Sequence, residues 1–142
     1  MRKLYLFAGM ALMAVMMAFV TSSCSKSDDD GAGGNGGDSS AIIGTWYMTF
    51  QSAKGNGYVV LTFAQNGNGL CKEYDHSTWQ TDIFTYSYAN GKLTVKWSPN
   101  DIEVVEVVSL TKTQMVLKGF PDKGTSTFYI MTQDMQNLLN SL

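Results

Sequence analysis

The sequence is poor in the residues on which most charged binding sites depend. Among its 142 residues there is one arginine, Arg2, and one histidine, His76. The 10 basic and 12 acidic residues nearly balance, and the basic ones form no cluster. A protein that grips a phosphate backbone needs clustered lysine and arginine. Nucleic acid is therefore not an expected partner. The length of the chain predicts one small domain.

The usual arrangements of catalytic residues are also missing. The sequence has no nucleophile elbow, no HExxH pair and no phosphate-binding loop. Glu73, Asp75 and His76 lie close together, and such residues can ligate a metal, but a solvated hairpin end explains them as well. We expect no enzyme activity, no catalytic residue, no metal and no cofactor. The alternative is an enzyme such as a glycosidase, which needs only two carboxylates.

The N-terminus has the layout of a secretory signal peptide. Arg2 and Lys3 are followed by an uncharged apolar run over residues 4–20 and by small residues at 21–23. The run is slightly long for a signal peptide and slightly short for a membrane span. The pattern predicts a signal peptide over residues 1–23, with an uncleaved anchor helix as the alternative.

Cys24 stands directly after the small residues, and "TSSC" resembles a bacterial lipobox. The resemblance implies that the Cys24 thiol is acylated and that membrane lipid is a partner. Two or more acyl chains hold a protein stably on a membrane. A chain beginning at Cys24 has 8 basic and 12 acidic residues, a net charge of 8 − 12 = −4. Only Cys71 then remains, either buried as a small apolar residue or paired with another chain.

An acidic run follows the lipobox cysteine, made of Ser27, Asp28, Asp29 and Asp30. Its position resembles the acidic export signal of Bacteroidota-type lipoproteins. The resemblance implies an outer-membrane lipoprotein that faces outward at the cell surface; the alternative is a cluster that only keeps a linker solvated. Residues 31–40 are half glycine with no large apolar residue. Residues 24–41 are therefore expected to form a flexible tether.

From residue 42 onward the sequence has the composition of an all-β domain, which we expect to span residues 42–142. Valine, threonine and aromatic residues dominate, and Gly-, Asn- and Pro-containing turns recur at short intervals. The breaks predict eight antiparallel strands, approximately over 43–53, 58–65, 69–75, 82–89, 92–98, 102–110, 114–120 and 125–132. Leu93, Val95 and Trp97 share one face of a strand, which is typical of a sheet buried on one side. A sandwich and a barrel both fit this pattern.

The last nine residues, "DMQNLLNSL", have a different period. Met135, Leu138, Leu139 and Leu142 follow i, i+3, i+4, i+7 spacing. This spacing predicts a short amphipathic helix, too short to be stable alone. Its apolar stripe must pack against the sheet or across one end of a barrel.

The first strand, "IIGTWYMTF", contains Gly44 and Trp46 and resembles the Gly-x-Trp start of lipocalins and fatty-acid-binding proteins. With "LTFAQNGNG", "FTYSYANGKLTV" and "MVLKG" it resembles the lipocalin-like domains of Bacteroidota surface lipoproteins. The resemblance implies an eight-stranded meander barrel that binds a small hydrophobic ligand. In one respect the sequence departs from lipocalins: its last strand, "TSTFYIMTQ", lacks the arginine that they place over the tryptophan. The sequence does not identify a protein partner.

An aromatic set supplies candidates for a ligand pocket. The candidate ligand-binding residues are Trp46, Phe63, Phe84, Tyr86, Tyr88, Trp97 and Glu106, and Trp79 belongs to the same aromatic inventory. The alternative is that the aromatic residues only fill the core of the barrel. In that case the domain would be an interaction module that contacts a protein or glycan through its loops or outer face.

Glu106 lies in "DIEVVEVVSL", on one face with Ile102, Val104, Val108 and Leu110. If that face points inward, the barrel contains a carboxylate that needs a partner, a raised pKa or a polar ligand. The alternative is an exposed face, or a β-bulge near residues 104–105 that turns Glu106 outward.

Overall fold

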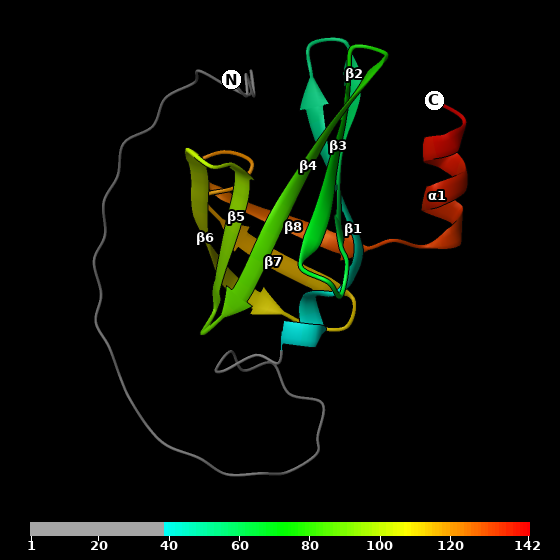
Figure 1. The fold of residues 1–142 in the computed structure, drawn as a ribbon. Coiled ribbons are helices and arrows are strands. Elements are labelled where there is room, and N and C mark those ends of the chain that lie inside the picture. The colour runs from blue at the N-terminus through cyan, green and yellow to red at the C-terminus, as the bar shows by residue number, and fades with distance from the viewer. Residues whose placement is uncertain (1–38) are drawn as a thin grey trace. The chain divides into compact units, whose positions relative to one another are not determined.

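The computed structural model describes residues 39–142, which form a closed eight-stranded barrel (Figure 1). Its elements are η1 (Ser39–Ile42), β1 (Gly44–Ser52), β2 (Gly55–Phe63), β3 (Asn68–Asp75), β4 (Thr78–Ala89), β5 (Lys92–Ser98), β6 (Asp101–Leu110), β7 (Gln114–Lys118), β8 (Thr125–Ile130) and α1 (Gln133–Asn140). Each strand pairs antiparallel with the next, and β8 pairs with β1. The predicted meander barrel with a C-terminal helix is confirmed. The predictions for the signal peptide, Cys24 and the acidic run lie outside the described residues.

Most strand boundaries lie within two residues of those predicted, and the larger differences are at the starts of β2 and β4. β2 begins at Gly55, three residues before the predicted start at 58. β4 begins at Thr78, four residues before the predicted start at 82. The turn is made by His76 and Ser77, both with positive φ, 52° and 66°. Two such residues are typical of a tight hairpin turn, where glycine or asparagine is the usual choice. Because neither is present, the residue types predicted a longer break between the two strands than the two-residue turn that forms.

Trp46 is buried in the barrel core and bonded to the end of η1. Its side chain is 1% exposed, and its indole Nε1 donates a hydrogen bond of 2.9 Å to the carbonyl oxygen of Ile42. Ile42 ends η1 and is itself fully buried. The short helix is thus fastened to the first strand across Gly44, whose φ of 139° suits glycine.

Helix α1 packs against the outer surface of the barrel rather than across its end. The Thr132 side chain caps the helix by accepting a hydrogen bond of 3.3 Å from the Met135 backbone nitrogen. Leu139 is buried against Tyr58 and Val60, which point outward from β2. Figure 1 shows α1 standing beside the wall formed by β1 to β4. Within residues 39–142, no helix has the length and apolar character needed to cross a membrane.

Candidate functional site

The interior of the barrel is filled by side chains. The void among Leu61, Phe63, Leu93, Val95 and their neighbours has a volume of about 10 Å³. A single water needs roughly 10–15 Å³ measured in this way. Among the described residues, this void in the barrel interior therefore has no room for a small organic ligand.

The predicted aromatic residues do come together, but they pack on one another. Phe63 and Phe84 have ring centroids 5.6 Å apart, Phe63 and Tyr86 are 4.9 Å apart, and Phe84 and Trp97 are 5.0 Å apart. Trp46 lies in the same core, and Tyr88 packs against it while partly exposed. Edge-to-face pairs of this kind stabilise a core beyond the area they bury. The geometry favours the filled-core alternative for all six aromatic candidates.

Two polar groups in this core are satisfied by specific partners. The Trp97 Nε1 donates to a carboxylate oxygen of Glu103 at 3.1 Å, and the Tyr86 hydroxyl donates to the Ala64 carbonyl oxygen at 2.7 Å. Desolvation by burial raises the pKa of Tyr86 above its ordinary value. The fold favours the neutral phenol over the phenolate. The contribution of Tyr86 to folding stability is therefore complete below about pH 10 and is lost as the pH rises further.

Glu106 points outward, which corrects its candidacy as a ligand-binding residue inside the barrel. Its side chain is exposed, and Oε2 lies 3.5 Å from Nζ of Lys118 on β7. On β6 the inward residues are Val105 and Val107, because Val105 lies opposite the buried Leu93 of β5. The exposed-face alternative is confirmed, and the irregularity in β6 lies between residues 107 and 109 rather than at 104–105.

Glu106→Gln should change neither stability nor ligand retention. An exposed ion pair contributes about 0–1 kcal/mol, so we expect the free energy of unfolding in urea to change by less than about 0.5 kcal/mol. Lys118→Met, which removes the partner charge, should give the same small effect. A loss above about 1 kcal/mol in either variant would mean that the carboxylate has a structural role.

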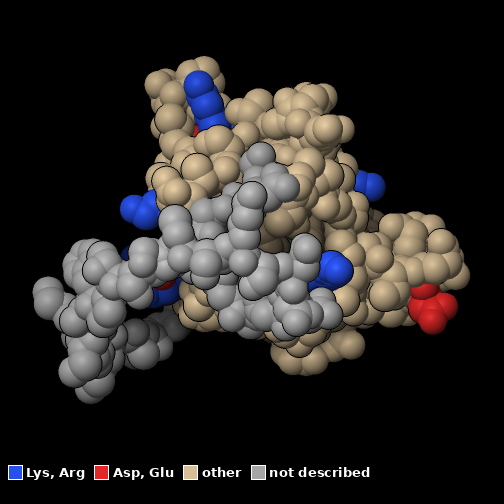
Figure 2. All heavy atoms as spheres, turned by 90° about the horizontal axis from the view of Figure 1, so that it is seen from below, with Lys and Arg blue, Asp and Glu red and all other residues tan. Residues whose placement is uncertain are grey.

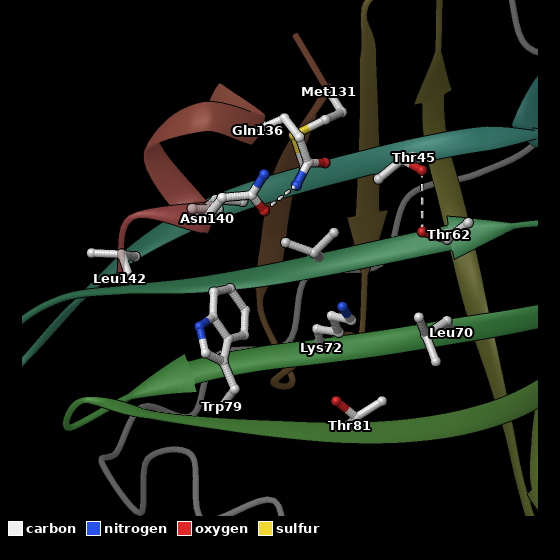
Figure 3. Close-up of a pocket in the computed structure, with 12 residues that line it drawn as sticks. Thr45, Thr62, Leu70, Lys72, Trp79, Thr81, Met131, Gln136, Asn140 and Leu142 are labelled. Carbon is white, nitrogen blue, oxygen red and sulfur yellow. Dashed lines mark hydrogen bonds between the residues drawn. The ribbon is translucent and has the colours of Figure 1, made fainter. Parts of the chain in front are cut away.

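A groove of about 460 Å³ lies outside the barrel, between α1 and the outer wall of β1 to β4 (Figure 3). This volume falls in the range of roughly 300–1,000 Å³ typical of small-molecule sites. We call it the α1 groove; it is lined by Thr45, Val60, Thr62, Leu70, Lys72, Trp79, Thr81, Met131, Gln136, Leu139, Asn140 and Leu142. About half of these side chains are apolar and half are polar.

The floor of the α1 groove is built from residues that strand pairing places side by side. Lys72 of β3 lies between Val60 of β2 and Thr81 of β4, each being its partner in register. Beside this row, the Thr45 and Thr62 hydroxyls are 3.1 Å apart and share a hydrogen bond. Alternate residues of a strand face the same side, so these groups follow from the register of the sheet.

The other wall is the face of α1 that turns toward the sheet. Gln136 donates through Nε2 to Oδ1 of Asn140 at 3.0 Å, an i, i+4 contact along the helix. Figure 3 shows both amides over the floor strands, with Trp79 rising from β4 toward the helix. Trp79 packs against Tyr74 with ring centroids 5.0 Å apart. Trp79 therefore belongs to the outer wall and not to the barrel interior.

Sequence reasoning missed the α1 groove, although one signal for it was present. The stretch "YVVLTF" of β2 is apolar at nearly every position. Tyr58 and Val60 are buried on its outer face, as Val59 and Leu61 are on its inner face. A continuous apolar run indicates a strand covered on both faces. Together with the amphipathic C-terminal helix, it pointed to a helix lying on the outside of this strand.

A second hollow of about 570 Å³ lies over β4 and β5, among Ile83, Thr85, Lys96, Trp97 and neighbouring residues. It is more open to solvent than the α1 groove, and only strand and turn residues line it. Ligand sites bury most of the ligand surface, so the α1 groove is the better candidate.

The remaining sequence candidates form no site in the described part of the chain. Nδ1 of His76 lies 2.8 Å from Oδ2 of Asp75 at the β3–β4 turn. Residues 39–142 contain no group of three or more side chains placed to hold a metal ion. Cys71 is buried in the barrel core, in line with the expectation of a small apolar residue.

The chain is similar to known proteins at the level of one domain family. A solved structure of a lipocalin-like protein from Bacteroides uniformis is similar, with 18% sequence identity and a TM-score of 0.49, over 64% of this chain and 99% of that one. No curated protein matches the chain. The family model of the lipocalin-like domain matches residues 42–117. This match spans more than half of the 142 residues, and the chain belongs to the lipocalin-like domain family.

Proposed function

We propose that this chain is a lipid-anchored, surface-exposed lipoprotein whose lipocalin-like domain binds a small amphiphilic molecule in the α1 groove. The observation that carries the proposal is the contrast between two volumes: about 10 Å³ inside the barrel and about 460 Å³ between α1 and the outer wall. A ligand needs space, and the groove provides it. The mixed lining suits a molecule with both polar and apolar parts.

The anchoring part of the proposal is supported by the order of the N-terminal features. Cys24 follows an apolar run and three small residues, and the acidic run 28–30 follows Cys24. A flexible chain of about 17 residues has an r.m.s. reach of roughly 20–25 Å. Such a tether would hold the domain near the lipid while leaving the α1 groove in water.

Filling the α1 groove should release its ligand. In Thr81→Trp a large ring replaces an exposed threonine on the groove floor, and tryptophan is well tolerated in strands. Native mass spectrometry of protein purified from its own host should find a stoichiometric small molecule on the wild type. We expect the bound fraction to fall about tenfold or more in Thr81→Trp, because the ring occupies the ligand's volume.

The matched control is Ser87→Trp, an exposed position on the same strand that does not line the groove. This variant should retain the ligand as the wild type does. Retention of the ligand by folded Thr81→Trp would place it elsewhere, and a wild type without any bound molecule would contradict the binding proposal.

A second candidate function is an interaction module that contacts a protein or glycan, and one observation favours it. The outer face of β6 carries Ile102, Val104 and Val108, which are 55%, 64% and 51% exposed. An apolar row in water is typical of a contact surface when its members are contiguous. A wild type without a bound small molecule would favour this candidate.

A further inference from the structure

Resting on the proposed function of the α1 groove as a binding site, we propose that its ligand is an acidic sugar. By this we mean a hydroxylated ring that carries a carboxylate. In this arrangement Lys72 binds the carboxylate, Trp79 covers the apolar face of the ring, and the polar side chains of both walls bind its hydroxyl groups.

The charge of the groove selects an anion. Lys72 has the only charged side chain among the twelve lining residues. Its neighbours in register, Val60 and Thr81, are uncharged, whereas Lys118 on β7 has Glu106 beside it. No salt bridge joins Lys72 to an acidic group within residues 39–142. An ammonium group with three donors among uncharged side chains is suited to a carboxylate.

The residues that line the groove contain one cation, Lys72, and no basic patch. On the face shown in Figure 2, the lysine side chains of the described residues stand apart from one another. A large polyanion is attracted by the summed electrostatic field of several cations. Lys72 is exposed and is the single lysine that lines the groove, which matches a ligand with a single acidic group.

The neutral polar groups favour a sugar over an acyl chain. Thr45, Thr62 and Thr81 bring hydroxyls from the floor, and Gln136 and Asn140 bring amides from α1. An amide has two donors and two acceptor sites, so the one bond between Gln136 and Asn140 leaves most of this capacity available. A hydrocarbon would cover these groups without replacing their bonds to water, which is costly. The hydroxyl groups of a sugar would replace those bonds.

Trp79 supplies the flat apolar surface that one face of a sugar ring requires. It lines the groove, it is partly exposed, and Tyr74 packs against it at 5.0 Å. An aromatic ring held in place in this way loses little conformational entropy when a ligand packs on it. Figure 3 shows Trp79 and Lys72 on adjacent strands, so one ring can contact both.

The test compares two soluble probes that differ in one group. These are 4-nitrophenyl β-D-glucuronide, which has a carboxylate, and 4-nitrophenyl β-D-glucoside, which has none. Ligand-observed NMR on the acylated protein in nanodiscs, with empty nanodiscs subtracted, gives both affinities. We expect the wild type to bind the glucuronide about tenfold more tightly, because a charge-assisted bond is added.

Lys72→Met keeps the apolar stem and removes the charge, so it should lower glucuronide affinity to that of the glucoside and leave the glucoside unchanged. Lys96→Met is the control, because Lys96 is an exposed lysine of β5 outside the groove. Circular dichroism should show both variants folded. Equal binding of the two probes by the wild type, or a preference that survives in Lys72→Met, would overturn the proposal.

Octanoate, added as a third probe, separates a sugar acid from an acyl acid. If octanoate binds more tightly than the glucuronide and Lys72→Met loses this binding, the ligand is an acyl carboxylate and the sugar assignment is overturned. If no probe binds while native mass spectrometry finds a molecule that Thr81→Trp loses, the sugar proposal fails and the groove remains the binding site. If that molecule is absent as well, the proposed function itself fails.

Discussion

Replacing Cys24 with alanine should abolish incorporation of labelled palmitate into this protein in cells. The thiol sulfur is the atom to which lipid is attached in the proposed lipoprotein, and alanine offers no nucleophile in its place. We therefore expect complete loss of label from the protein band on a gel. The protein should also shift from the membrane fraction, because stable anchoring requires the acyl chains.

Cys71→Ala is the matched control for this experiment. Cys71 is the other cysteine of the chain and is 4% exposed in the barrel core, so its removal should leave the label intact. Replacing Asp28, Asp29 and Asp30 with asparagine should also leave the label, but reduce cleavage of the protein by protease added to whole cells. Label retained in Cys24→Ala would overturn the anchoring proposal.

The fold was largely predictable because a barrel with one buried face has a strong period of two. Leu93 and Val95 are buried while Lys92 and Lys96 are exposed, as their alternation predicts. Asn90 and Gly91 both have positive φ in the turn between β4 and β5, which is the conformation that "NG" favours. The turn between β3 and β4 is made by His76 and Ser77. These residue types do not indicate a two-residue turn, so the predicted start of β4 was four residues too late.

The direction of β6 could not be predicted from its own residues. Both of its faces are apolar: Val105 and Val107 on one, Ile102 and Val104 on the other. A shift of one residue in register exchanges the two faces of a strand. The choice is made by pairing with β5, which sets Val105 opposite the buried Leu93. Glu106 points outward because of this pairing between β6 and β5.

The α1 groove depends even more on tertiary structure. Lys72, Thr81 and Gln136 belong to β3, β4 and α1, and their side chains converge only after the barrel closes and the helix docks. The sequence predicts the amphipathic helix and its need for an apolar surface. It does not specify how far the helix stands from the sheet, and that distance is what creates a groove instead of a packed interface.

The aromatic residue with the largest effect on stability should be Trp46. Trp46→Ala removes a side chain that is 1% exposed, together with its hydrogen bond to Ile42. Large-to-small substitutions of buried tryptophan cost about 3–5 kcal/mol, through lost burial and the cavity left behind. We expect a decrease of that size in the free energy of unfolding, measured in urea by circular dichroism.

Two further variants distinguish packing from the hydrogen bond of Trp46. Trp46→Phe keeps most of the apolar volume but leaves the buried Ile42 carbonyl without its donor, at a cost of about 1–3 kcal/mol. Trp79→Ala removes a tryptophan of the same size from the partly exposed outer wall, and its cost should be clearly smaller than that of Trp46→Ala. Removing a tryptophan from a packed core must cost more stability than removing one from the rim of a groove. Equal losses from Trp46→Ala and Trp79→Ala would therefore contradict the filled barrel as the main source of stability.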